Sequence, residues 1–204
     1  AFFQRGGQGL NITVPFKERA HALSQTASPA AARAGAANCL IPRKTGLHAE
    51  NTDGVGLVRD MVANLGWQLE GRRTLVIGAG GAVRGILHPL LGERPADLTI
   101  VNRTPDRAAA LAERHGDGPI PVQAGALSSV EGETFDLVIN GTSASLSDAL
   151  PELPEVKLSA RCCCYDLVYA AAPTAFMRWS AAGAAWAVAD GLGMLVEQAA
   201  ESYY

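Results

Sequence analysis

The residues best suited to proton transfer lie in two short polar segments near the start of the chain. Asn11 and Thr13 alternate with apolar residues, so their side chains should project from one face of a strand. Lys17 follows in the first turn of an expected helix, where the helix dipole disfavours a cation and so favours release of its proton. Such a lysine suits general acid–base chemistry. Taken alone, Lys17 also suits a surface position, and Asp53, in the run 51–54, suits a helix N-cap.

A glycine-rich turn follows the apolar run 75–77 and precedes a helical pattern. Its residues are Gly78, Ala79, Gly80, Gly81 and Ala82. A strand, a Gly-x-Gly turn and a helix together indicate a pyrophosphate site, because Gly80 lets a phosphate approach the backbone and the helix N-terminus favours its charge. Val83 occupies the third small position of the usual fingerprint, so a tight turn without a ligand is the alternative.

The residues that follow the apolar run 98–101, the next expected strand after the glycine-rich turn, discriminate between nicotinamide cofactors. NAD-binding folds usually place an acidic residue there to hold the ribose 2′-hydroxyl. This chain has Asn102 and Arg103 instead, with Arg107 one helical turn later. Guanidinium groups suit a 2′-phosphate, which a carboxylate would repel. The pattern therefore predicts NADP rather than NAD, and a solvated arginine pair is the alternative.

The elements that must position these residues alternate between strand and helix. We expect strands at 10–14, 39–41, 47–50, 73–77, 98–101, 135–139, 161–167 and 185–188. Helices are expected from Pro15 as first helical residue, at 30–34, from 52 or 53 to 65, after the glycine-rich turn to 91, and at 105–114, 174–182 and 194–203. Apolar strands separated by helices predict an α/β fold, with a Rossmann-like, doubly wound parallel sheet.

Composition limits the class of protein. Of 204 residues, 48% are hydrophobic and 18% charged, which indicates a globular rather than a disordered chain. The formal net charge of -3 argues against a general nucleic-acid binder, and no apolar run is long enough to cross a bilayer. Cys39 and the adjacent Cys162, Cys163 and Cys164 are expected to be buried thiols of a reduced, cytoplasmic protein, with no metal site.

Seven motifs in order make the chain similar to the shikimate dehydrogenase family. They are residues 11–17, 36–38, 51–54, 78–82, 102–104, 165–169 and 191–200. The resemblance implies an oxidoreductase that reversibly reduces 3-dehydroshikimate to shikimate with NADPH, in aromatic amino-acid biosynthesis. The alternatives are an NAD-dependent quinate/shikimate dehydrogenase, which Arg103 disfavours, and a non-catalytic NADP-binding paralogue or fragment, which Lys17 and Asp53 disfavour.

The resemblance also implies a role for each matched residue. Lys17 and Asp53 would be the catalytic pair, in which Lys17 exchanges a proton with the reacting oxygen and Asp53 orients Lys17. The substrate-binding residues would be Asn11, Thr13, Asn38, Tyr169 and Gln198. The cofactor would contact Gly78, Ala79, Gly80, Gly81, Ala82, Asn102, Arg103, Thr104, Arg107, Thr142, Ser143, Leu167, Gly191 and Met194.

The same resemblance implies three parts of the chain. Residues 1–53 would form a partial α/β substrate domain, residues 54–190 the NADP-binding domain, and residues 191–204 a helix that returns to the substrate domain. Family members begin with a further portion that carries a Ser-x-Ser site for the substrate carboxylate, so we expect the substrate domain here to be N-terminally incomplete. The expected partners are shikimate and 3-dehydroshikimate, with no nucleic acid and no membrane, in a monomer or a homodimer.

Overall fold

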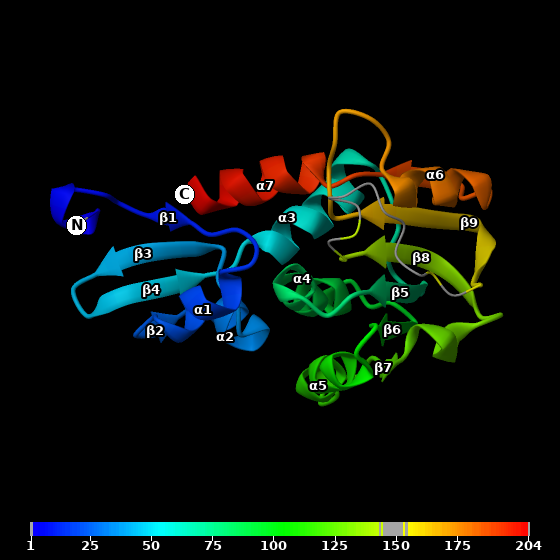
Figure 1. The fold of residues 1–204 in the computed structure, drawn as a ribbon, viewed down its shortest axis with the longest axis horizontal. Helices are drawn as coiled ribbons and strands as arrows, with labels where there is room; N and C mark the ends of the chain where they lie inside the picture. The colour runs from blue at the N-terminus through cyan, green and yellow to red at the C-terminus, as the bar shows by residue number, and fades with distance from the viewer. Residues whose placement is uncertain (1, 143, 145–152, 154, 204) are drawn as a thin grey trace.

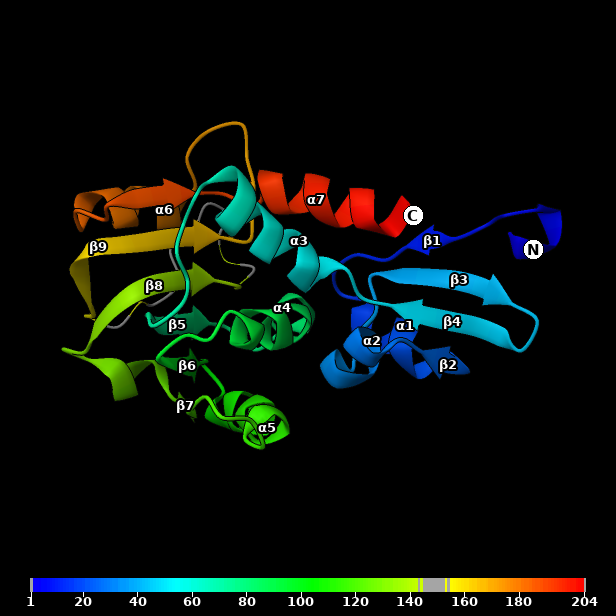
Figure 2. The same cartoon turned by 180° about the vertical axis from the view of Figure 1, so that it is seen from behind.

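The chain forms two sheets that lie at opposite ends of the molecule (Figure 1). A computed structural model describes residues 2–142, 144, 153 and 155–203. The larger sheet has the strand order β10-β9-β8-β5-β6-β7, and the smaller one has the order β1-β3-β4-β2. Two helices, α3 (Asp53–Arg59) and α7 (Leu192–Tyr203), run between the sheets and join them, as Figure 2 shows from behind.

The larger sheet is parallel throughout. Its strands are β5 (Arg73–Ile77), β6 (Asp97–Val101), β7 (Val122–Gly125), β8 (Thr134–Asn140), β9 (Lys157–Asp166) and β10 (Ala187–Ala189). The connecting elements are α4 (Gly81–Gly92), α5 (Pro105–His115), the 3-10 turn η3 (Leu127–Val130) and α6 (Ala175–Ala182). Within this sheet the chain begins with the central strand β5 and adds β6 and β7 on one side. It then returns to the centre and adds β8, β9 and β10 on the other side of β5. This order creates the switch point at which such sheets bind ligands, and it confirms the predicted doubly wound fold.

Both faces of this sheet are covered, which explains its continuous apolar strands. On one face Val76 and Ile100 pack with residues of α3, α4, α5 and α7. On the other face Leu75 and Ile77 pack with Phe176 of α6 and Val130 of η3. The adjacent cysteines of β9 follow the strand alternation: Cys163 faces the first cluster, whereas Cys162 and Cys164 face the second. All four cysteines are buried and free, as predicted.

The smaller sheet consists of short strands with two short helices against it. The strands are β1 (Leu10–Asn11), β2 (Thr26–Ala27), β3 (Cys39–Arg43) and β4 (Gly46–Glu50), and η1 (Phe3–Arg5) precedes them. The helices are α1 (Lys17–Ala22) and α2 (Pro29–Ala34). The core here is made of small side chains, such as Ala20, Ala31 and Ala49, so the helices can approach the strands closely. The antiparallel pair β3–β4 forms a hairpin from the two strands that were predicted at 39–41 and 47–50.

The helix α3 (Asp53–Arg59) packs tightly against elements on either side. It continues into a π-helical turn, η2 (Asp60–Asn64). A side chain at Gly54 would collide with Pro89 of α4, and one at Gly56 would lie 2.7 Å from the backbone nitrogen of Gln198 in α7 (Leu192–Tyr203). Because both positions lack a side chain, α3 sits in direct backbone contact with α4 and α7. These contacts fix the two sheets relative to each other.

The structure corrects several of the sequence-based assignments, including strand β2, which was not predicted, and β10, which lies at Ala187–Ala189 rather than at 185–188. Pro15 is not the first helical residue, because it lies in a turn in which the Phe16 N–H donates to the Thr13 carbonyl, and α1 begins at Lys17. The same turn ends β1 at Asn11, before the predicted end at residue 14. Strand β7 was not predicted, because an edge strand with exposed side chains carries no apolar run. Strand β9 begins at Lys157 rather than Arg161, since its first half is only partly buried.

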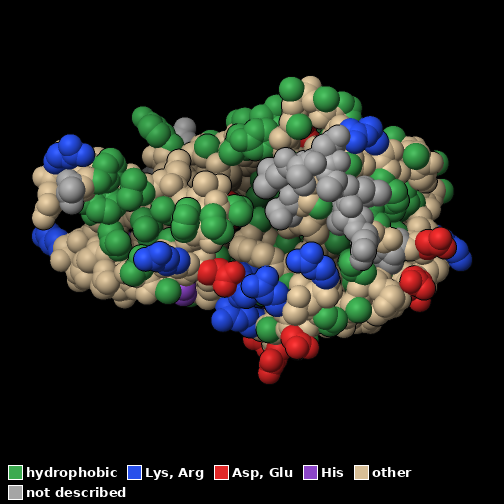
Figure 3. All heavy atoms as spheres, viewed as in Figure 1, with side chains coloured by type: hydrophobic (Ala, Val, Ile, Leu, Met, Phe, Trp, Pro, Cys, Tyr) green, Lys and Arg blue, Asp and Glu red, His purple; other side chains and the backbone are tan. Residues whose placement is uncertain are grey.

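Ion pairs connect the helices of the smaller sheet to those of the larger sheet. Arg84 of α4 lies 3.5 Å from Glu18 of α1, and Arg33 of α2 lies 4.0 Å from Asp117 after α5. Figure 3 shows basic and acidic side chains gathered together there, rather than one broad field of a single sign. Pairs this exposed contribute little stability individually. Among the described residues, none of the helices is both long and apolar enough to span a membrane.

We predict that His115 makes stability depend on pH. The residue is 3% exposed on α5, and no hydrogen-bond partner of its Nδ1 lies among the described residues. Burial, with the neighbouring His88 and Arg33, lowers its pKa from 6.5 to about 4. Between these values the unfolded chain binds a proton that the folded chain does not, so the free energy of unfolding falls as pH falls from 7 to 4, by up to about 3 kcal/mol. Urea unfolding of wild type and His115→Phe should show a flatter pH profile for the variant. Parallel profiles would contradict this prediction.

Candidate active site

A buried ion pair forms the centre of the candidate site. Lys17 is the first residue of α1, and Asp53 is the first residue of α3. The Lys17 Nζ donates to Asp53 Oδ2 over 2.6 Å, and the two side chains are only 11% and 3% exposed. The helix dipole disfavours the Lys17 charge, and the carboxylate offsets that effect. The fold thus joins two residues that are 36 positions apart.

Asn38 connects this pair to the C-terminal helix. It precedes β3 and is 2% exposed, so it is not the turn residue that its type alone would suggest. Its Nδ2 lies 2.8 Å from Thr52 Oγ1, 3.2 Å from Asp53 Oδ1 and 2.9 Å from Gln198 Oε1. Its Oδ1 accepts the Thr52 N–H at 2.9 Å. Asn38 therefore holds α3 and α7 in one hydrogen-bonded cluster.

Asn51 and Thr52 belong to this cluster, although sequence patterns predicted no individual role for either. The Asn51 Oδ1 accepts the Asp53 N–H at 3.1 Å. The Thr52 Oγ1 lies 2.9 Å from the Gln198 carbonyl oxygen and 3.0 Å from Ser202 Oγ. The signal that could have found them is their place in the same polar motif, 51–54. Both residues fix the helices that carry the functional side chains.

Two glycines of α4, Gly81 and Gly85, let this helix of the larger sheet pack directly against the ion pair. A Cβ at Gly85 would lie 2.8 Å from Asn51 Oδ1 and 3.0 Å from Asp53 Oδ2. A Cβ at Gly81 would lie 3.4 Å from the Cβ of Lys17. The ion pair therefore lies beside the first two turns of α4. The Asp53 carboxylate has room there because Gly85 has no side chain.

The glycine-rich turn at the carboxyl end of β5 fits a ligand. Gly78 has φ +110°, and an added Cβ would lie 3.0 Å from the Gly141 carbonyl oxygen, so its own surroundings require glycine. Gly80, the N-cap of α4, has φ −86°, and an added Cβ would meet no described atom within 4 Å. Neither backbone strain nor packing explains glycine at position 80. Open space before a helix N-terminus suits the close approach of a pyrophosphate, so the turn fits a dinucleotide.

The turn after β6 presents two arginines. The Asn102 Nδ2 donates to the Thr104 carbonyl over 2.9 Å, which holds the turn into α5. Arg103 and Arg107 are exposed, and no carboxylate of the described residues lies within 4 Å of either guanidinium. Both positions lie one strand away from the glycine-rich turn. They can therefore meet a phosphate on a ligand that spans these two turns.

A second polar cluster closes the carboxyl ends of β8 and β9. The Asn140 Nδ2 donates to Asp166 Oδ1 over 3.0 Å, and both residues are fully buried. The Thr142 hydroxyl and N–H donate to Asn140 Oδ1, and the Thr174 hydroxyl donates to Asp166 Oδ2 over 2.6 Å. Thr142 is thus fixed at the switch point between β5 and β8. Ser143 lies outside the described residues.

Comparison with known proteins decides which family this geometry belongs to. Residues 60–149 match the family model "Shikimate / quinate 5-dehydrogenase", and residues 1–40 match "Shikimate dehydrogenase substrate binding domain". The NADP(+) shikimate dehydrogenases of Alkalilimnicola ehrlichii and Cellvibrio japonicus are 55% and 51% identical to the whole chain, which covers 74% of each. The chain belongs to the family of NADP-dependent shikimate dehydrogenases.

Solved structures agree with this family. The Ael1 enzyme of Pseudomonas putida is 43% identical, with a TM-score of 0.84, over 99% of this chain and 74% of that one. Shikimate 5-dehydrogenase of Thermus thermophilus, in complex with NADP(H) and shikimate, is 33% identical, with a TM-score of 0.79, over 98% of this chain and 73% of that one. The predicted family, fold class and cofactor are thereby confirmed.

The other predicted shikimate dehydrogenase residues lie at the edges of these clusters. Asn11 and Thr13 are exposed and alternate with the half-buried Leu10 and Ile12, as the pattern predicted. Tyr169 is 50% exposed. The structure gives these three side chains no hydrogen bond to Lys17 or Asp53 among the described residues. Their predicted roles in substrate binding stay predictions.

Leu167, Gly191 and Met194, three of the residues predicted along the nicotinamide, lie close together. A side chain at Gly191 would collide with the carbonyl oxygen of Leu167, so the chain after β9 and the start of α7 are in backbone contact. Met194, in the first turn of α7, is 7% exposed. No group of three or more His, Cys, Asp or Glu among the described residues is arranged to hold a metal ion.

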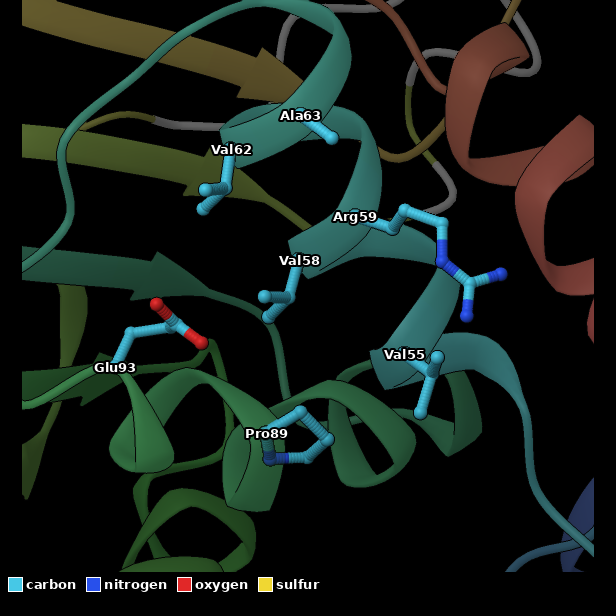
Figure 4. Close-up of a pocket in the computed structure, with 7 residues that line it drawn as sticks. All are labelled: Val55, Val58, Arg59, Val62, Ala63, Pro89 and Glu93. Atoms are coloured by element: carbon cyan, nitrogen blue, oxygen red, sulfur yellow. The ribbon is translucent and has the colours of Figure 1, made fainter.

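An apolar groove between α3 and α4 is separate from the candidate site. Figure 4 shows its lining, which consists of Val55, Val58, Arg59, Val62, Ala63, Pro89 and Glu93. Its volume is about 390 Å³. None of the predicted site residues lines it, so the groove takes no part in the acid–base chemistry of Lys17 and Asp53.

We predict that Gly85→Ala disrupts the ion pair, whereas Gly92→Ala in the same helix does not. The added methyl group at position 85 would displace Asp53 or Asn51. A methyl group at position 92 meets no described atom within 4 Å and should raise stability by about 0.5 kcal/mol, because glycine weakens a helix. Shikimate oxidation should fall at least 100-fold for Gly85→Ala and stay unchanged for Gly92→Ala. Equal activity of the two variants would contradict the contact.

Proposed function

We propose that this chain catalyses the reversible, NADP-dependent reduction of 3-dehydroshikimate to shikimate, with Lys17 as the proton carrier. The observation that carries the proposal is the buried Lys17–Asp53 pair at 2.6 Å, which lies beside the glycine-rich turn. The names of the relatives supply the reaction, since curated members of the family are called shikimate dehydrogenase (NADP(+)). The geometry supplies an acid–base group next to a dinucleotide site.

The proposed chemistry needs one proton and one hydride. NADPH, when bound, supplies the hydride that reaches the carbonyl carbon of the substrate. The Lys17 ammonium donates a proton to the carbonyl oxygen, which becomes the new hydroxyl, and accepts that proton in the reverse direction. Asp53 holds the Lys17 side chain in place and stabilises its charged form between turnovers.

Asn38 and Gln198 are proposed to select the substrate. Their amides bond each other at 2.9 Å, so a substrate hydroxyl that binds either group must compete with this bond. A hydroxyl that replaces this bond keeps both amides paired. An analogue without the hydroxyl leaves the two amides bonded to each other and gains no hydrogen bond from them, so it binds less tightly. We propose that Asn11, Thr13 and Tyr169 provide further contacts to the polyol.

We propose the cofactor contacts and the division of the chain on the same grounds. The turn at residues 78–82 would hold the pyrophosphate, and Asn102, Arg103, Thr104 and Arg107 the 2′-phosphate end. Thr142, Ser143, Leu167, Gly191 and Met194 would line the nicotinamide. Residues 1–53 would bind substrate, residues 54–190 NADP, and residues 191–204 would return to the substrate side. Free buried cysteines suit a reducing compartment, so we place the reaction in the cytoplasm, in a monomer or a homodimer.

We predict that Lys17→Ala and Asp53→Asn each lower kcat for shikimate oxidation at least 100-fold, because general acid–base groups contribute about 10²–10⁴-fold. NADP affinity should stay within about threefold of wild type, since neither side chain is assigned to the nucleotide. Initial rates followed at the nicotinamide absorbance band measure this. Lys44→Ala, in the exposed hairpin turn, is the matched control. A wild-type chain without turnover, or a Lys17→Ala chain with full turnover, would overturn the proposal.

We predict that Arg103→Ala weakens NADP but not NAD. Losing a charged hydrogen bond to the 2′-phosphate should raise KM for NADP about tenfold or more, while KM for NAD changes less than about twofold. Arg94→Ala removes an exposed arginine that pairs with Glu70, and serves as the control. Equal changes for both cofactors would show that Arg103 does not read the 2′-phosphate.

A further inference from the structure

A buried hydrogen bond between Asp60 and Tyr165 lies outside the residues assigned to catalysis or binding. The Tyr165 hydroxyl donates to Asp60 Oδ2 over 2.7 Å. Asp60 is 4% exposed and Tyr165 is fully buried. The Asn64 amide donates to the other carboxylate oxygen, Oδ1, over 3.0 Å. Burying a carboxylate this deeply costs free energy, which the hydrogen bonds from Tyr165 and Asn64 offset in part.

Both partners touch the first turn of α7. The Met194 N–H donates to the Tyr165 hydroxyl oxygen over 3.3 Å. A side chain at Gly193 would collide with the Asp60 carboxylate, so the helix start lies directly against that group. A carboxylate at a helix N-terminus is stabilised by the unpaired N–H groups and by the helix dipole. Asp60 and Tyr165 therefore fix the position and direction of α7 at its start.

The pair also joins the two halves of the reaction proposed above. Asp60 opens the π-helical turn that continues α3, and α3 begins with Asp53. Tyr165 precedes Asp166 on β9, and the Asp166 carboxylate holds Asn140. Single π-turns interrupt helices frequently at functional sites, because they redirect side chains. The Asp60–Tyr165 pair thus links α3, which carries Asp53, to the carboxyl ends of β8 and β9, which are assigned to the nicotinamide.

We propose that Asp60 and Tyr165 are positioning residues for hydride transfer, which set the first turn of α7, and with it Met194, against the carboxyl ends of β8 and β9. This inference rests on the proposed function for its kinetic consequence. Neither residue is among those proposed to bind the substrate or the cofactor. Its effect runs through Met194 on one side and through Gln198, one turn further along α7, on the other.

Tyr165→Phe tests the proposal because it removes only the hydroxyl. We expect kcat to fall about tenfold, while KM for shikimate changes less than about threefold. The deuterium isotope effect on shikimate oxidation, with deuterium at the carbon that gives up the hydride, should rise, because a misaligned hydride transfer becomes more rate-limiting. A purely structural role would lower the unfolding midpoint without moving the isotope effect.

Variants of Asp60 separate the hydrogen bond from the charge. Asp60→Asn keeps an acceptor oxygen for the Tyr165 hydroxyl, so kcat should stay within about threefold of wild type. Asp60→Ala removes the acceptor and should resemble Tyr165→Phe. The double variant Asp60→Ala/Tyr165→Phe should be no slower than the worse single variant, since both changes break one interaction.

Ser180→Ala is the matched control for loss of a buried hydroxyl. Ser180 is fully buried in α6, on the other face of the sheet, and its hydroxyl donates to the Phe176 carbonyl. We expect this variant to lose stability and to keep the wild-type kcat and isotope effect. If Tyr165→Phe behaves like Ser180→Ala, the positioning role is overturned.

Hydrogen exchange of the chain without cofactor provides a readout that needs no turnover. The Met194 amide should exchange at least about tenfold faster in Tyr165→Phe than in wild type, while amides of β5 keep their rates. Unchanged Met194 exchange would overturn the proposal even if kcat falls. A wild-type chain that fails to oxidise shikimate would instead overturn the proposed function, and the exchange result would still decide whether the pair fixes α7.

Discussion

The arrangement of the whole site depends on burying the Asp53 carboxylate. A side chain only 3% exposed cannot keep its charge without partners, and the surrounding structure supplies two. Lys17 provides the opposite charge, and Asn38 provides an amide N–H. The two partners come from different segments, and Asn51 fixes the same turn by accepting the Asp53 backbone N–H. The need to pair one charge therefore fixes α1, the start of β3 and α3 relative to one another.

Glycines of α3 and α4 provide the space that burial of the Asp53 carboxylate requires. Gly54 and Gly56 let α3 touch α4 on one side and α7 on the other, and Gly85 leaves space for the Asp53 carboxylate. A larger residue at any of these positions would separate elements whose polar groups must stay within hydrogen-bond distance. Tight packing and buried polarity are thus two aspects of one interface. This explains why the cluster reaches Gln198, although 160 positions separate it from Asn38.

Sequence patterns could predict the larger sheet but not the contacts between elements. The apolar run 73–77 and the glycine-rich turn predicted β5 and the start of α4, because local periodicity and turn chemistry determine such features. Strand β7 escaped prediction because its side chains are largely exposed at the sheet edge. The roles of Asn51, Thr52 and Asp60 depend on partners far away in sequence, and no local pattern specifies those partners. Lys17 and Asp53 were paired only through the family resemblance, since spacing alone did not connect them.

The helix α4 explains how one element can serve both the proton carrier and the dinucleotide site. Gly81 and Gly85 are four residues apart, so they lie on the same face of the helix, and they face Lys17 and Asp53 respectively. The N-terminus of the same helix points to the open space in front of Gly80. A rigid helix therefore sets the separation between a bound pyrophosphate and the ion pair. Because Lys17 and Asp53 belong to α1 and α3, that separation is kept only while α4 stays packed against these two helices through Gly81 and Gly85.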